Sequence, residues 1–166
     1  ENIGFIENFT VKLGNLVIGG VGNNNITLTW TAPGDDGNTG TATAYDIRYS
    51  SSVITEANWG AATQVTGEPT PAPAGTGQSF VVTGLTASTT YYFAIKASDE
   101  VPNASALSNV ASAQTIADVI PPAAVTNLAV VKAKSRTLTL TWTAPGDDGS
   151  SGTATGYDMR YSMEPI

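Results

Sequence analysis

The chain has 166 residues, 41% of them hydrophobic, and its 17 Gly and 9 Pro are typical of short strands joined by tight turns. Seven basic against fourteen acidic residues give a net charge of −7, which repels nucleic acid and anionic membrane surfaces, and no apolar run is long enough to span a bilayer. Cysteine and histidine are both absent, which excludes disulfides, thiol chemistry and the usual general base near neutral pH.

The first fourteen residues form an extension with no counterpart later in the chain. Within it Phe9, Val11 and Leu13 alternate, which predicts three apolar side chains on one face of a strand. Two interpretations are open. The strand packs on its own domain, or it is added to the sheet edge of a neighbouring molecule, which makes these three residues a binding site for another protein chain.

A strong internal repeat follows. The segment 30–50, WTAPGDDGNTGTATAYDIRYS, returns at 142–162 as WTAPGDDGSSGTATGYDMRYS, with 17 of 21 positions identical. Self-similarity at this level indicates one structural unit used twice. We expect the first unit to cover residues 15–116 and the second to begin at residue 123.

The residues around each repeat alternate between apolar and polar, which is the pattern of a half-buried strand. Ile26, Leu28 and Trp30 alternate with threonines, and Leu138, Leu140 and Trp142 do the same in the second copy. The outward positions of the next predicted strand hold Asp46 and Arg48, which we interpret as a solvated charge pair. The predicted aromatic core residues are Trp30, Tyr45, Tyr49 and Tyr91 in the first unit and Trp142, Tyr157 and Tyr161 in the second.

The middle of the first unit is less regular. Trp59 lies in a segment that has room for one short edge strand, and a Pro-rich and Gly-rich loop spans 67–77. Strands are predicted over 80–82, 91–97 and 110–114. Trp59 and the outward-facing Tyr92 are candidates for stacking on a sugar or a partner chain, and the alternative for Trp59 is that it covers the open end of a sandwich.

The first unit resembles a fibronectin type III domain. Trp30 stands where that family has the tryptophan of its second strand, and Tyr45 and Tyr49 match the pattern of its third strand. The segment 85–91, LTASTTY, resembles the family motif Leu-x-Pro-x-Thr-x-Tyr, with Ala87 in place of proline. The resemblance implies an all-β, immunoglobulin-like sandwich in which the hydroxyl of Tyr91 anchors a corner between two strands. The sequence PGDDG, followed by GTAT and YDIRYS, resembles repeats of secreted and surface proteins of bacteria and archaea.

The second unit is predicted to follow a stiff linker over 117–122 that contains two consecutive prolines. Residues 123–166 suffice for the first three strands of such a sandwich, so the fold prediction is a tandem β-sandwich whose second copy is incomplete. Three explanations are open: the chain is a piece of a longer protein, another chain supplies the closing strands, or the C-terminal half pairs differently.

Paired carboxylates occur in both copies of the PGDDG segment. Asp35 and Asp36, with their twins Asp147 and Asp148, offer oxygen ligands for calcium, although they lack the alternation of a dedicated calcium loop. The alternative is a plain turn in which Asp side chains accept local backbone N–H groups. Two adjacent, solvated carboxylates do not make an acid and base pair, and no triad or phosphate loop is present, so we predict no enzyme and no cofactor other than this possible calcium.

Together these patterns predict a non-catalytic extracellular or cell-surface module: a structural spacer, an adhesive stalk or a filament-forming subunit of a microbial surface or matrix protein. Its partners would be other protein chains, including copies of itself in a fibre, or a polysaccharide, and neither nucleic acid nor a membrane span. The alternative function is an accessory fibronectin type III region of a secreted hydrolase that acts on an insoluble polymer.

Overall fold

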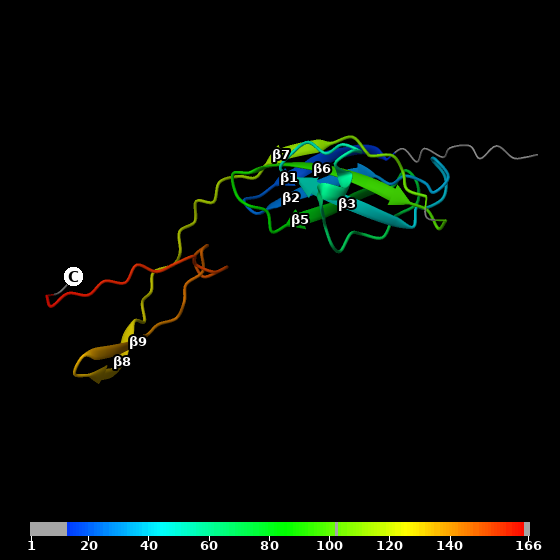
Figure 1. The fold of residues 1–166 in the computed structure, drawn as a ribbon. Helices are drawn as coiled ribbons and strands as arrows, with labels where there is room; N and C mark the ends of the chain where they lie inside the picture. Colours follow the sequence, from blue (N-terminus) through cyan, green and yellow to red (C-terminus); the bar gives the residue numbers. More distant parts are fainter. Residues whose placement is uncertain (1–12, 102, 165–166) are drawn as a thin grey trace, which may run out of the picture. The chain divides into compact units, whose positions relative to one another are not determined.

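The computed structural model describes residues 13–101 and 103–164, which divide into two units between Asp118 and Val119 (Figure 1). The first unit is built of two antiparallel sheets of order β1-β2-β5 and β4-β3-β6-β7. Its strands are β1 (Gly14–Val21), β2 (Asn25–Thr31), β3 (Ala44–Ser50), β4 (Thr63–Gln64), β5 (Gly77–Thr83), β6 (Thr90–Ser98) and β7 (Ala111–Gln114). A single 3₁₀ turn, η1 (Trp59–Ala61), precedes β4. The predicted all-β, immunoglobulin-like sandwich is confirmed.

The core of the first unit lies between the two sheets because each strand turns its alternate apolar residues inward. The side chains with no measurable exposure in this core are Ile26, Leu28, Ile47, Phe93 and Ile95. Trp30 and Tyr45 are buried beside them in an edge-to-face pair, with ring centroids 5.3 Å apart. Tyr49 and Tyr91 are half-buried and pack against the same core.

Two hydrogen-bonded corners hold the first sandwich closed. The backbone N–H of Thr86 donates to the hydroxyl of Tyr91 at 3.1 Å, which is the corner that the family resemblance implies. The side chain of Asn109 both accepts from the N–H and donates to the carbonyl of Leu16, so it ties the start of β1 to the segment before β7. Because these bonds satisfy backbone groups that no strand pairs, the corners stay ordered.

The side chain of Gln78 binds the Pro-rich loop between β4 and β5 at two points. Gln78 donates to the carbonyl of Thr70 at 2.9 Å and accepts from the N–H of Ala72 at 3.1 Å. The same amide oxygen accepts from the buried hydroxyl of Tyr45 at 2.6 Å. The loop is therefore anchored to the core residue that begins β3.

In the second unit the described residues hold one antiparallel hairpin of β8 (Ala129–Lys134) and β9 (Thr137–Thr141). The third strand expected around residues 157–161 is not formed. In the first unit the equivalent strand β3 pairs along its whole length with β6, and the described part of the second unit has no counterpart of β6. A strand without that partner lacks the ladder of backbone hydrogen bonds that would hold it in a sheet.

The aromatic residues predicted as the core of the second unit are consequently not buried. Tyr157 is 51% exposed and Tyr161 is 97% exposed, so their assignment to a core is wrong for this structure, and Trp142 is only half-buried. Trp142 and Tyr157 nevertheless keep the edge-to-face pairing of their twins, with centroids 5.4 Å apart. This pair is local enough to form without the opposite sheet.

The boundary between the units differs from the predicted linker over 117–122. Pro122 bridges to Gly149, and the N–H of Gly149 donates to the carbonyl of Pro121 at 3.0 Å. Both prolines therefore belong to the second unit, whose compact region begins at Val119. Proline has no backbone N–H to donate, but its carbonyl oxygen still accepts hydrogen bonds, and Pro121 binds the loop through this oxygen.

Candidate functional site

The two PGDDG loops have the same conformation in both copies. The carboxylate of Asp35 accepts from the N–H of Asp36 at 2.9 Å, and that of Asp147 accepts from the N–H of Asp148 at 3.2 Å. Each loop closes through an isolated bridge, Asp36 to Thr39 and Asp148 to Ser151. The first aspartate of each pair thus accepts a hydrogen bond from a backbone amide of its own turn.

This geometry bears on the calcium hypothesis. Calcium takes six to eight oxygen ligands, so a site needs several groups besides two adjacent carboxylates. Among residues 13–101 and 103–164, no group of three or more His, Cys, Asp or Glu side chains gathers in one place. The structure does not bring Asp46 to a site shared with the loop, since that carboxylate binds Arg48.

The predicted strand-addition site is only partly described. Phe9 and Val11 lie outside the described residues. Leu13 is 5% exposed and belongs to the core of its own unit, just before β1 begins. Leu13 therefore packs on its own domain, the first of the two interpretations, and strand addition to a neighbouring molecule is wrong for this residue.

An aromatic and charged cluster lies on the outer face of β3 and β6, opposite the core. Arg48 points outward from β3 and places its guanidinium carbon 4.9 Å from the ring centroid of Trp59. Lys96 points outward from β6 and places its ammonium nitrogen 5.3 Å from the same ring. Cations at these distances are attracted to the face of an indole ring. Trp59 therefore packs on this outer face, and the expectation that it covers the end of the sandwich is wrong.

Two carboxylates complete the cluster. Asp46 forms a forked ion pair with Arg48 at 2.9 Å, as the sequence predicts, and the same guanidinium donates to the carbonyl of Trp59. Glu56 binds Lys96 at 2.6 Å and also accepts from the N–H of Leu107 at 2.7 Å. The segment around η1 is thereby tied to both strands and to the loop before β7.

The electrostatics follow from these contacts. The ammonium group of Lys96, together with the N–H of Leu107, lowers the pKa of Glu56 below its ordinary value. The carboxylate of Asp46 raises the pKa of Arg48. Each cation on the ring thus has its own counter-ion, and the cluster of these four charged groups has no net charge.

A groove of about 340 Å³ opens beside this cluster. Its lining includes the small residues Ala44, Ser98 and Ala104, which leave space that larger side chains would fill, together with Tyr45 and Ala97 of the core. Trp59, Asp46 and Lys96 supply its aromatic and polar walls. We refer to this space as the Trp59 groove.

Sequence reasoning found part of this site. The pattern indicated that Asp46 and Arg48 face outward together and that Trp59 is a candidate contact residue, but it gave no role to Lys96 or Glu56. The available signal was the position of Lys96 between the inward residues of β6, which places it on the outer face near Arg48. Tyr92, the other aromatic candidate, is half-buried and does not line the groove.

Known proteins similar to this chain support its fold. The family model of the fibronectin type III domain matches residues 11–111. Chitinase A1 of Niallia circulans is 35% identical over 150 residues, and Exoglucanase B of Cellulomonas fimi is 31% identical over 140 residues. These matches cover 88% and 82% of the chain but only 18% and 11% of the two enzymes.

Among solved structures, a fibronectin type III domain derived from the human KIAA0970 protein aligns over 79% of the chain and 90% of its own length. Its sequence identity is 14% and the TM-score is 0.49. No helix within the described residues is long and apolar enough to cross a membrane. The strand topology and the family match together show that this chain belongs to the fibronectin type III family.

Proposed function

We propose that the chain is a non-catalytic spacer module of an extracellular protein that acts on a polysaccharide. The observation that carries this proposal is the similarity to a chitinase and an exoglucanase over more than four fifths of the chain. Because the shared region is a small part of either enzyme, the similarity concerns an accessory region rather than a whole catalytic protein. Chitin and glucans are polymers too large to enter a cell, which favours an extracellular location.

The chemistry of the described residues agrees with a non-catalytic role. General acid and base work on a glycosidic bond needs two carboxyl groups across a cleft, one of them with a raised pKa. Here the carboxylates of Asp46 and Glu56 form ion pairs with the side chains of Arg48 and Lys96. Those of Asp35 and Asp147 accept hydrogen bonds from backbone N–H groups. The pKa of Glu56 moves downward, which is opposite to what a general acid requires.

The fold suits a spacer. Antiparallel ladders joined by the Tyr91 and Asn109 corners hold the first unit in one shape. A rigid unit keeps a catalytic domain at a fixed reach, whereas a flexible linker of equal length samples many distances. The structural and adhesive functions predicted from sequence use the same property, but the relatives favour the accessory role in a polysaccharide-degrading protein.

The test is a fusion experiment. A glycan hydrolase catalytic domain and a binding domain for the same insoluble polymer are joined either by this chain or by a Gly/Ser linker of matched reach. We expect the chain to increase release of sugar from the insoluble polymer and to leave the rate on soluble oligosaccharides unchanged. Equal rates for both fusions on both substrates, or hydrolysis by the chain alone, would reject the proposal.

A further inference from the structure

The Trp59 groove brings an indole ring, paired charges and open space together on the outer surface of the first unit. It lies on the first unit alone, between the segment around η1 and the bridge that Ala104 makes to Ser98. Its volume of about 340 Å³ falls within the range of small-ligand sites. Its position on the outer face of β3 and β6 leaves the core undisturbed when a ligand enters.

The wall of the groove is already rigid. Arg48 and Lys96 hold the Trp59 ring at 4.9 and 5.3 Å, and each cation is itself fixed by a carboxylate. The side chains of Arg48 and Lys96 are each only 18% exposed, so they are packed in place. A ring that is ordered before binding loses little conformational entropy when a ligand stacks on it.

The charges of the groove select a neutral ligand. Asp46 neutralises Arg48, and Glu56 neutralises Lys96, so an ionic ligand would have to break one of these pairs. The Asp46 carboxylate and the Ser98 hydroxyl still line the space as hydrogen-bonding groups. An indole wall beside a few polar groups matches a pyranose ring, which presents C–H groups on one face and hydroxyls at its edge.

We infer that the Trp59 groove is a binding site for a neutral polysaccharide chain. This inference rests on the proposed function for the polymer class and goes beyond it by assigning the contact residues. Trp59 stacks on a sugar ring, and Asp46 and Ser98 bond to its hydroxyl groups. The module then adds weak contact with the polymer to its role as a spacer.

The experiment uses the full chain and two soluble probes, cellohexaose and chitohexaose, in an NMR titration that follows the backbone amides and the three indole N–H signals. With the wild-type chain we expect shifts confined to residues 44–46, 59, 96–98 and 104 for at least one probe. Trp59→Ala should weaken this binding by about tenfold or more. Trp142→Ala, which removes the tryptophan of the other unit, is the matched control and should bind like wild type.

A second variant guards against a folding defect. Ser98→Leu fills the groove and leaves the contacts of Trp59 with Arg48 and Lys96 in place, so it should abolish binding while thermal unfolding stays close to wild type. Undiminished binding in both Trp59→Ala and Ser98→Leu, shifts that map elsewhere, or no binding of either probe by the wild-type chain would overturn the inference.

The two proposals fail separately. If the wild-type chain binds neither probe but its fusion still increases activity on the insoluble polymer, the spacer function stands and the sugar site does not. If the probes bind in the groove but the fusion gives no increase, the site stands and the spacer function is rejected.

Discussion

Residues 30–50 and 142–162 share 17 of 21 amino acids, and the structure gives both segments the same loop but only the first of them a strand. The loop bridges, the Asp–Arg pair and the edge-to-face Trp–Tyr contact occur in both copies. In contrast, Tyr45 is 7% exposed and its twin Tyr157 is 51% exposed.

The difference separates what a sequence dictates locally from what it requires of distant partners. Each shared feature joins residues at most 15 positions apart in the chain, as in Trp30–Tyr45 and Trp142–Tyr157, so its chain-entropy cost is low. The features that differ depend on β6, which follows β3 in the first unit by some forty residues. Strand formation and burial here are therefore tertiary effects, in line with the strong context dependence of β-propensity.

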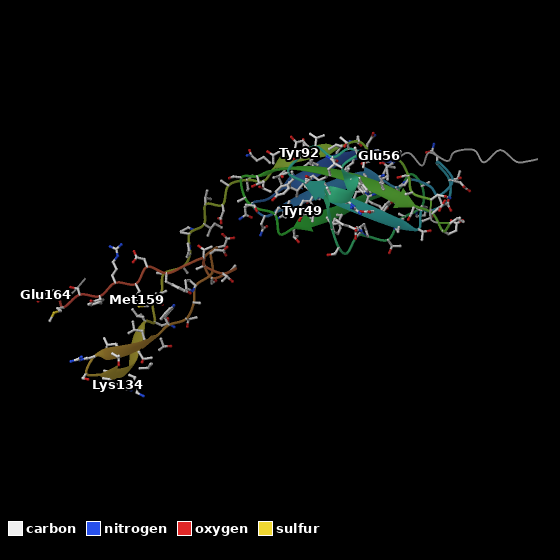
Figure 2. All side chains as sticks on the ribbon, viewed as in Figure 1. Tyr49, Glu56, Tyr92, Lys134, Met159 and Glu164 are labelled. Carbon is white, nitrogen blue, oxygen red and sulfur yellow. The ribbon has the colours of Figure 1, made fainter. Side chains whose placement is uncertain are left out.

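The largest expected effect comes from shortening the side chain at the same position of both copies. Ile47 is fully buried in the core between the two sheets, whereas its twin Met159, labelled in Figure 2, is 54% exposed. We expect Ile47→Ala to lower the free energy of unfolding of the first unit by about 2–5 kcal/mol, from lost burial and the cavity left behind. Met159→Ala should change stability by less than about 0.5 kcal/mol. Urea unfolding followed by the NMR signals of β3 and β9 measures each unit separately.

A large cost for Met159→Ala would contradict the comparison, because it would mean that the second copy buries this position in solution. Equal and small costs for both variants would mean that the first sandwich does not have the core described here.

The second test addresses what the copies share. A Cβ on Gly34 would lie 1.8 Å from the backbone oxygen of Thr39, and one on Gly146 would lie 1.8 Å from that of Ser151. Since the obstacle is backbone, the loop itself must move, and we expect Gly34→Ala to cost roughly 1–3 kcal/mol. Gly146→Ala should disturb the amide signals of residues 147–152 in the same pattern. Gly60→Ala is the control, because a Cβ there has nothing within 4 Å.

If Gly34→Ala were as stable as Gly60→Ala, and the two loops kept their amide signals, the close approach would not hold the loop.

The calcium hypothesis is tested with the same amide signals. A calcium site predicts that the amides of the first loop shift when calcium is added to wild type, and that these shifts vanish in the variant with both Asp35→Asn and Asp36→Asn.

The sequence predicts most of the first unit because its signals are local and repeated. Alternation defined the inward residues of β2, β3 and β6, and the LTASTTY motif identified the Tyr91 corner. The PGDDG segment indicated a turn in which aspartate accepts a backbone N–H, one of the two alternatives considered, and such a bond is present in both copies.

The sequence did not predict the parts that depend on contacts between distant residues. The alternation of Tyr157 and Tyr161 is as clear as that of their twins, but a pattern cannot show whether a partner strand is present. The Trp59 groove joins residues 44–46, 59, 96–98 and 104, and no periodicity connects the irregular segment around η1 with β6. The alternation of Leu13 with Phe9 predicts a strand, but it does not show whether the strand packs on its own domain or on a neighbouring molecule.

A third test weakens one corner of the complete unit. Tyr91→Phe removes the hydroxyl that accepts from the N–H of Thr86 and keeps the ring that packs against Tyr49 at 5.7 Å. We expect a loss of about 1 kcal/mol, the usual net contribution of one hydrogen bond. Tyr161→Phe is the matched control, since Tyr161 is 97% exposed and its change should be within experimental error. Thermal unfolding measures both, and equal melting temperatures for wild type and Tyr91→Phe would show that the corner adds no stability.

The smallest expected effect concerns the ion pair of Glu56 and Lys96, which has no twin in the described part of the second unit. Lys96 and the N–H of Leu107 lower the pKa of Glu56 below 4.5, so the folded state favours the charged carboxylate. The resulting stability is present above the unfolded-state pKa and is lost as the pH falls through the lower, folded-state pKa. Because Glu56 is more than half exposed, solvent screens the pair, and the contribution at pH 7 should be below about 1 kcal/mol.

The measurement compares wild type with Glu56→Gln in urea between pH 7 and pH 2.5, at low and high salt. The difference in unfolding free energy should be largest at pH 7 and low salt, and it should disappear at the acidic end, where both proteins carry a neutral group at this position. Glu100→Gln, an exposed carboxylate of the same unit, serves as the control. A difference that persists below pH 3 would show that Glu56 acts through packing or through a neutral hydrogen bond to Leu107, and not through its charge on Lys96.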